Sequence, residues 1–461
     1  MRTSVAVLGA FLLLVGAAGA HAQTAPPIDQ NHVAGVAPAT VFASAKTETL
    51  RLDNGAKLVV LYDAQATTVV AEAFFAVGLA DEQRKNGINA LIARLWTNES
   101  ESRDAALIEH DIAKLGAIGT SLSHDWVELW GVSAANDYDQ GELLRAMLTQ
   151  LVAAPRFSTE FLADGKADVA RAAAIEQDTP LSATLNALRA RAFSESMYGR
   201  TLFGDSNQRT SDEVGAYYQR YFRPERAVFV IAGPITSSRA KEMVEHSLGA
   251  GGWNVGKAAP PLPTVPVETV PAGLRPLVLP VRAPATITAL GFLAPGTGNV
   301  RRIDWATLLI LDAVLGGGKA SRLFHALRDG ETSVGYDVRT TLMPGRGQSL
   351  WAVYVTGDSA GETARAALSS ELAAVASGKK PVTEAELTRA RTYLLARHAE
   401  DRQRLRDRAW GAGWAELMGL GADFDTDLSA RVALVSTEDV NRMAHELFSA
   451  NAAVVYTLPN R

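Results

Sequence analysis

Residues 211–232 read SDEVGAYYQRYFRPERAVFVIA, and residues 437–458 read TEDVNRMAHELFSANAAVVYTL. The two stretches align without a gap, so that Val214 matches Val440, Phe222 matches Phe448 and Ala227 matches Ala453. In each stretch, Ser or Thr followed by acidic residues predicts a helix start, because the helix dipole favours negative charge there. A run of β-branched and aromatic residues then predicts a strand. The match predicts that one α+β unit occurs twice.

Each repeated stretch closes a half of the chain that begins with a pair of predicted strands. These pairs are residues 49–52 with 57–62, and residues 277–281 with 286–293. Amphipathic helices are predicted elsewhere, at residues 103–115, 142–152, 161–177, 181–193, 303–315 and 384–405. Strands followed by several helices, twice over, predict the fold class α+β, with two duplicated α/β sandwich domains. Each domain is expected to have an antiparallel or mixed sheet with helices on one face.

Two stretches rich in Ala, Pro and Thr mark the predicted domain boundaries. Residues 258–273, AAPPLPTVPVETVPAG, have no helical period and are typical of a linker. This linker separates an N-terminal domain, residues 45–257, from a C-terminal domain, residues 274–461. Residues 23–44 are expected to form an extended arm.

Residues 1–22 have the three parts of a secretory signal peptide. Arg2 supplies a positive charge, residues 5–19 are apolar, and Ala20-His21-Ala22 is a small-x-small cleavage site. The apolar run is shorter than the roughly 20 residues that span a membrane. The sequence therefore predicts export to a bacterial periplasm, without a membrane anchor.

Composition excludes several kinds of protein. The chain has no cysteine, which excludes disulfides and cysteine-based metal sites. Its net charge of −5 gives no basis for binding nucleic acid. With 461 residues and 47% hydrophobic composition, the chain has enough apolar material for two domain cores.

A glycine-rich segment is the densest motif of the second half. Residues 316–328 read GGGKASRLFHALR, and Gly335-Tyr336 follow. A phosphate-binding loop is excluded, because Ala313 stands where that motif needs its first glycine. Arg322 lies off the apolar stripe of the predicted helix. Arg322 and Tyr336 either cap carbonyls and fill a core, or donate hydrogen bonds to a peptide carbonyl or oxyanion.

This segment resembles the C-terminal signature of the pitrilysin/insulinase-type metallopeptidases: a Gly-rich turn, Ser-Arg-Leu-Phe-x-x-Leu-Arg, and a Tyr that starts a strand. The resemblance extends over nearly the whole mature chain, for example to the entry hairpin at residues 52–55. It implies that Arg322 and Tyr336 face a zinc ion across an interior cavity and bind the substrate peptide.

The family's zinc-binding helix carries H-x-x-E-H, and this chain departs from that motif. Aligned on Gly87, the motif falls on Ala90, Ala93 and Arg94. Alanine cannot ligate zinc, and arginine is a permanent cation. The helix that would supply the third ligand, residues 163–174, contains no Glu, and Glu176 comes too late in the register. No metal is therefore expected in this chain.

The resemblance implies a non-catalytic, substrate-binding subunit of a two-subunit zinc peptidase. Zinc, its histidines and the glutamate base are expected in an HxxEH-bearing homologous partner, in a heterodimer or larger complex. Peptidase activity is expected only in that complex. The alternative is an exported peptide-binding or assembly protein without a peptidase partner.

A rival motif is the G-x-S-x-G of residues 357–361, which would make Ser359 a nucleophile with His398 or His445 as base. It lacks an upstream His-Gly-Gly-Gly and a parallel βαβ order, so a turn that caps a helix is favoured.

None of the eight histidines forms a pair at metal-ligand helix spacing. Trp410 and Trp414 share one helix face, for core packing or a subunit interface.

Overall fold

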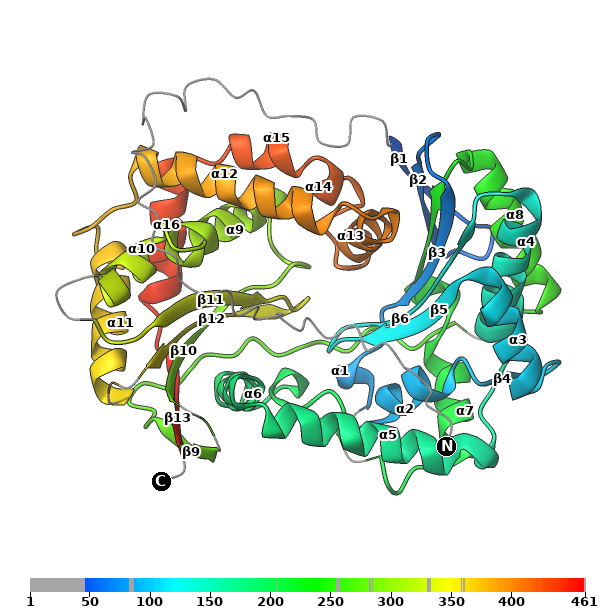
Figure 1. Ribbon diagram of the computed structural model, residues 1–461, viewed down its shortest axis with the longest axis horizontal. Coiled ribbons are helices and arrows are strands. Elements are labelled where there is room, and N and C mark those ends of the chain that lie inside the picture. Colours follow the sequence, from blue (N-terminus) through cyan, green and yellow to red (C-terminus); the bar gives the residue numbers. More distant parts are fainter. Residues whose placement is uncertain are drawn as a thin grey trace, which may run out of the picture.

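The computed structural model describes residues 46–82, 87–204, 206–253, 258–281, 283, 285–329, 333–357, 359 and 361–459 (Figure 1). The predicted signal peptide, residues 1–22, and the predicted arm, residues 23–44, lie outside the described residues. Within the described part of the chain, no helix combines the length and apolar character needed to cross a membrane.

The first half forms a mixed six-stranded sheet. Its strands, in spatial order, are β1 (Lys46–Arg51), β2 (Lys57–Tyr62), β8 (Ala227–Gly233), β3 (Thr68–Phe75), β6 (Val127–Ala134) and β5 (Ala117–Leu122). Strand β8 runs parallel to β2 and antiparallel to β3. The predicted strand of the first repeated stretch is thus a central strand, buried along its whole length.

The second half forms a mixed five-stranded sheet with the same plan. Its strands, in spatial order, are β11 (Asp337–Met343), β12 (Gln348–Gly357), β10 (Thr286–Pro295), β13 (Ala453–Pro459) and β9 (Leu277–Val281). Strand β13 runs parallel to β9 and antiparallel to β10, as β8 does to β2 and β3. The predicted α+β class and the duplication are confirmed, and β1 is an addition to the first sheet.

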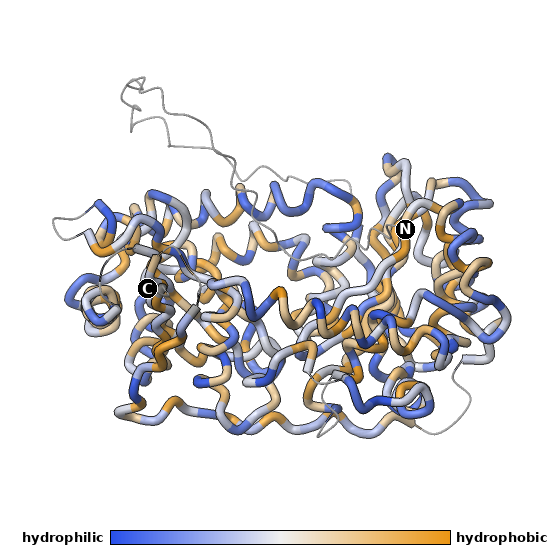
Figure 2. The backbone as a smooth tube through the Cα atoms, turned by 60° about the horizontal axis from the view of Figure 1, so that its bottom comes forward, coloured by the Kyte–Doolittle hydropathy of each residue, from blue (hydrophilic) through white to orange (hydrophobic). Residues whose placement is uncertain are grey.

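One face of each sheet is covered by helices that belong to the same half of the chain (Figure 1). Those of the first half are α2 (Ile88–Leu95), α3 (Ala105–Leu115), α4 (Asp137–Leu144), α5 (Thr159–Asp178), α7 (Ser211–Tyr221) and α8 (Ser237–Ala250). Those of the second half include α9 (Arg302–Gly316), α11 (Gly361–Ala376), α12 (Glu384–Asp401) and α16 (Thr437–Phe448). Figure 2 shows hydrophobic residues along the strands and alternating hydropathy along these helices.

The opposite face of each sheet is covered by a helix from the other half. Helix α13 (Leu405–Leu417) of the second half packs on β3 and β8, and helix α6 (Pro180–Ala192) of the first half packs on β10 and β13. Strands with apolar residues on both faces need cover on both. The expectation of helices on one face is therefore correct for each half's own helices, and the crossing helices complete each sandwich.

Residues 258–276 form neither helix nor strand between α8 and β9, as a linker would. The segment is fixed at two points. Nη2 of Arg226 donates hydrogen bonds to the carbonyls of Pro260 and Pro261, and the carboxylate of Glu268 accepts hydrogen bonds from the backbone of Glu195 and Ser196. The exact division at residues 257 and 274 stays a prediction.

Candidate functional site

The helix that would carry the zinc motif is α2. Two of its three motif positions lie in the core, and the third, Arg94, is half-buried. Gly87 caps the helix with a φ of 93°, a left-handed conformation that favours glycine. Ala90 and Ala93 are 1% and 5% exposed and belong to the hydrophobic core. The Ala93 carbonyl accepts a hydrogen bond from Thr120 of β5 (2.6 Å). Ala90 and Ala93 therefore contribute apolar contacts where the zinc motif would have metal ligands.

A buried carboxylate from outside α2, that of Glu82, binds the start of this helix. Glu82 accepts hydrogen bonds from the backbone N–H groups of Gly87 (2.7 Å) and Asn89 (2.9 Å). Burial raises the pKa of Glu82 to about 7, although these hydrogen bonds oppose the shift. Glu82 thus satisfies orphan donors at the helix start.

Helix α5 does not supply a third ligand. Asp168 pairs with Arg171 at 2.6 Å on the exposed side of the helix. Glu176 lies near the end of α5, where its carboxylate accepts a hydrogen bond from Asn186 (3.3 Å). Among the residues that the structure describes, no three His, Cys, Asp or Glu side chains group closely enough to hold a metal ion. The residues at this position do not fit zinc.

Arg322, the predicted substrate-binding arginine, is engaged within its own half. Its guanidinium forms a two-pronged ion pair with Glu386 of α12 (2.5 and 2.7 Å). It also donates hydrogen bonds to the carbonyls of Lys380 (2.6 Å) and Pro381 (3.0 Å). Its side chain is 12% exposed. Peptide binding by Arg322 stays a prediction, and it would require these contacts to break.

Tyr336 is more accessible. Its backbone N–H donates to the carbonyl of Thr356 (3.0 Å), which extends the β11–β12 ladder, and its side chain is half exposed. Arg322 lines an open hollow of about 650 Å³ that Tyr336 does not line. Another arginine of the same segment, Arg328, is exposed, and its guanidinium lies 4.9 Å from the ring centre of Phe324.

The Ser359 hypothesis gains no geometric support. His398 bonds to Asp425 (3.2 Å), and Nδ1 of His445 lies 3.0 Å from the Ala376 carbonyl. Strand β12, which precedes Ser359, is antiparallel to both of its neighbours, whereas a nucleophile elbow follows a parallel strand.

Trp410 and Trp414 share a helix face, as predicted, and their rings stack with centres 5.9 Å apart. Trp410 also meets Trp126 of the first half edge-on at 6.2 Å. The tryptophans therefore pack between the halves of one chain.

A polar network at the junction of the two halves was not predicted as a unit. Asp125 accepts a hydrogen bond from the Tyr198 hydroxyl (2.6 Å) and another from the backbone of Arg346 in the second half (3.1 Å). Burial raises the pKa of Asp125. The network could not be predicted from the sequence, because its residues lie far apart in the chain and no periodicity links them.

Comparison with known proteins gives matches to a peptidase M16 domain and to zinc proteases. Residues 209–394 match the family model described as "Peptidase M16 inactive domain". An uncharacterized zinc protease of Streptomyces coelicolor is 26% identical over 295 residues, which cover 61% of this chain and 62% of that protein. An uncharacterized zinc protease of Mycobacterium leprae is 30% identical over 161 residues, which cover 34% of this chain and 35% of that protein.

Solved structures share the fold. A peptidase M16 inactive domain from Pseudomonas fluorescens matches with a TM-score of 0.78 and 16% identity, covering 90% of this chain and 98% of its own. A protease from Helicobacter pylori matches with a TM-score of 0.78 and 18% identity, covering 90% of this chain and 100% of its own.

Proposed function

We propose that this chain is the non-catalytic, substrate-binding subunit of a heteromeric zinc peptidase, because residues 209–394 match the M16 inactive-domain model and the zinc-motif positions hold no metal ligands. A homologous partner with an H-x-x-E-H helix would hold the zinc, its histidines and the glutamate base. Peptide hydrolysis then belongs to the complex. The export that residues 1–22 predict is part of the proposal.

One observation carries this proposal: helix α2 packs against β5 and α5, but the positions where the zinc motif falls hold Ala90, Ala93 and Arg94. A chain that keeps the scaffold without the ligands can still present a peptide. The Gly-rich segment and Tyr336 of the other half are retained.

We assign peptide binding to Tyr336 and Arg328. The donors of Arg322 are taken up by Glu386 and two carbonyls, whereas Arg328 and Tyr336 are exposed. A guanidinium and a phenol can each donate a hydrogen bond to a peptide carbonyl, or to the oxyanion that forms when water attacks it. Arg322 then acts as a positioning residue that ties the Gly-rich segment to α12.

The test is to purify the chain with its H-x-x-E-H homologue and measure peptide hydrolysis and bound zinc, for each subunit alone and for the mixture. Activity is expected only in the mixture. Arg328→Ala and Tyr336→Phe should each lower turnover by about 10²-fold, the scale for the loss of one oxyanion donor. Arg239→Ala, which removes an exposed arginine of α8, is the control and should leave turnover unchanged.

Two outcomes contradict the proposal. Hydrolysis by the isolated chain would show that it has a catalytic centre of its own. A stable mixture without activity would instead favour a peptide-binding or assembly protein. Unchanged turnover in both Arg328→Ala and Tyr336→Phe would remove the assignment of these two residues.

A further inference from the structure

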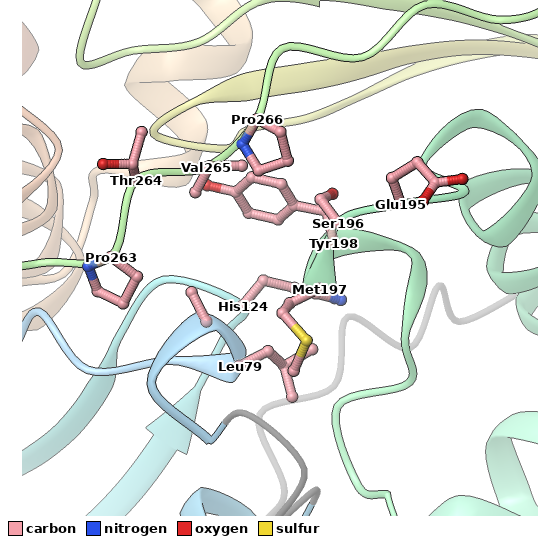
Figure 3. Close-up of a pocket in the computed structure, with 11 residues that line it drawn as sticks. Leu79, His124, Glu195, Ser196, Met197, Tyr198, Pro263, Thr264, Val265 and Pro266 are labelled. Atoms are coloured by element: carbon pink, nitrogen blue, oxygen red, sulfur yellow. The ribbon is translucent and has the colours of Figure 1, made fainter.

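A cavity of about 130 Å³ lies where the linker crosses the junction between the halves (Figure 3). Its walls come from α1 (Leu79–Glu82), the turn between β5 and β6, residues 195–198 and residues 263–266. In Figure 3 the side chains of Leu79 and Met197 lie on one side, opposite Val265 and Pro266. The lining is therefore mainly apolar.

The walls of this cavity are held by hydrogen bonds, so the space is preformed. The Glu268 carboxylate accepts hydrogen bonds from the backbone of Glu195 (2.8 Å) and Ser196 (2.9 Å). The backbone of Glu268 donates to the side chain of Gln348 in the second half (2.7 Å). The Leu79 N–H donates to the His124 carbonyl (3.0 Å). A preformed site loses little freedom when it is filled.

Tyr198 and His124 beside the cavity already have partners, whereas the buried hydroxyl of Ser196, which also lines it, has none. The Tyr198 hydroxyl donates to Asp125 (2.6 Å) and accepts from the backbone of Gly347 (3.2 Å). Arg189 donates to the ring of His124 at 2.7 Å, and Nε2 of His124 lies 3.0 Å from the carbonyl of Arg200. Burial and the charge of Arg189 lower the pKa of His124 well below its usual range, so the ring is neutral.

These surroundings select an uncharged occupant. A charged group entering the cavity would lose its hydration without gaining a free partner of opposite charge. Glu195 also lines the cavity, but its side chain is exposed and points away from the centre in Figure 3. For comparison, an apolar protein cavity of roughly 150 Å³ binds benzene.

We propose that this cavity binds one uncharged apolar side chain of benzene size, that of phenylalanine or leucine, from a peptide. That the group belongs to a peptide rests on the proposed function, whereas the selection for an uncharged apolar group rests on the cavity itself. The site would give the peptide-binding subunit a side-chain preference of its own.

The direct test uses the full chain without a partner. Saturation-transfer NMR measures binding of N-acetyl-phenylalaninamide, with the amide of N-acetyl-glutamate as the charged comparison. Saturable binding of the phenylalanine compound is expected, with at least tenfold weaker binding of the glutamate compound. Equal binding of the two compounds, or no saturable binding of either, would overturn the proposal.

Two variants change the size of the cavity in opposite directions. Ala80→Phe places a ring at the cavity wall and should weaken binding of N-acetyl-phenylalaninamide by at least tenfold. Val267→Phe adds the same ring type at a linker position that is 82% exposed, and it should leave binding unchanged. Met197→Ala enlarges the cavity and should shift the preference towards N-acetyl-tryptophanamide. Melting temperatures show whether each variant is folded.

If Ala80→Phe is folded and binds as tightly as the unaltered chain, the assignment of the cavity is wrong. If Ala80→Phe does not fold, Met197→Ala decides: an unchanged preference for N-acetyl-phenylalaninamide over N-acetyl-tryptophanamide would show that the assignment of the cavity is wrong. Failure of the proposed function gives a different pattern: the isolated chain binds the phenylalanine compound, but no mixture with an H-x-x-E-H homologue hydrolyses peptides.

Discussion

Gly413 of α13 lies directly against Phe74 of β3, so that a Cβ atom on Gly413 would stand 2.6 Å from Cε2 of Phe74. This contact joins the two halves of the chain. A similar contact joins them elsewhere, where a Cβ atom on Gly291 of β10 would stand 2.9 Å from Cγ of Leu188 on α6. Both crossing helices therefore approach a sheet closely because one glycine leaves room.

Gly413→Leu is expected to destabilise the chain by about 1–3 kcal/mol, the usual cost of overpacking a filled core. The measurement is urea unfolding of the isolated chain. Gly215→Leu in α7 is the matched control, because a Cβ atom there meets no other atom within 4 Å. That control should be neutral or stabilising, since leucine favours helix over glycine. Equal effects of the two changes would show that α13 does not depend on the contact with Phe74.

Arg322→Ala should lower the free energy of unfolding by about 1–3 kcal/mol, because it removes the ion pair from Glu386, which keeps only its hydrogen bonds from Thr383, and the donors from two carbonyls. Arg328→Ala removes an exposed side chain and should change stability by less than about 0.5 kcal/mol. Urea unfolding of both variants measures the difference. If Arg322→Ala is as stable as the unaltered chain, Arg322 is free of its ion pair in solution and returns as a candidate peptide ligand.

Stability is expected to depend on pH through two buried carboxyls beneath α13. Glu72 is 1% exposed and Glu128 is fully buried, and they lie on β3 and β6 of the first sheet. The charged groups facing them are Arg406 and Asp407 of α13 and Arg402, which follows α12, and Ser121 of β5 donates to Glu128. Burial raises the pKa of Glu128 to about 7, and burial and Glu128 raise that of Glu72.

A raised pKa means that the folded state holds a proton that the unfolded state has lost. Stability from this source is therefore full below the ordinary pKa of 4.5 and is lost as pH rises towards about 7, by up to about 1.4 kcal/mol per pH unit for each proton. Urea midpoints from pH 4.5 to pH 8 measure this loss. Glu128→Gln should flatten the curve, whereas Glu242→Gln, at a side chain that is 69% exposed, should not. An unaltered curve in Glu128→Gln would contradict this account.

The triple change Ala90→His, Ala93→Glu and Arg94→His should not create a tight zinc site. The third ligand is missing from α5, and groups that would orient the new histidines are missing as well. Metal content after dialysis is expected to stay well below one zinc per chain. One tightly held zinc per chain would show that the metal site is closer to intact than its residues indicate.

Much of the local structure was predictable. The repeated stretches became α7 with β8 and α16 with β13, and their helices begin in capping boxes at Thr210 and Ser436, one residue before the predicted starts. These signals are local, because a cap and a strand depend on neighbouring residues. The engagement of Arg322 was not predictable, since its partner Glu386 is 64 residues away and no periodicity links them.

The sequence by itself determined the two repeats and the absence of ligands from the zinc motif, because side-chain chemistry at Ala90, Ala93 and Arg94 does not depend on folding. Only the tertiary structure decided that α6 and α13 each pack on the sheet of the other half, that Arg322 pairs with Glu386 of α12, and that the linker lines a cavity. These features arise from contacts between segments far apart in the chain. Such contacts depend on how the helices and sheets pack together, which no local sequence pattern specifies.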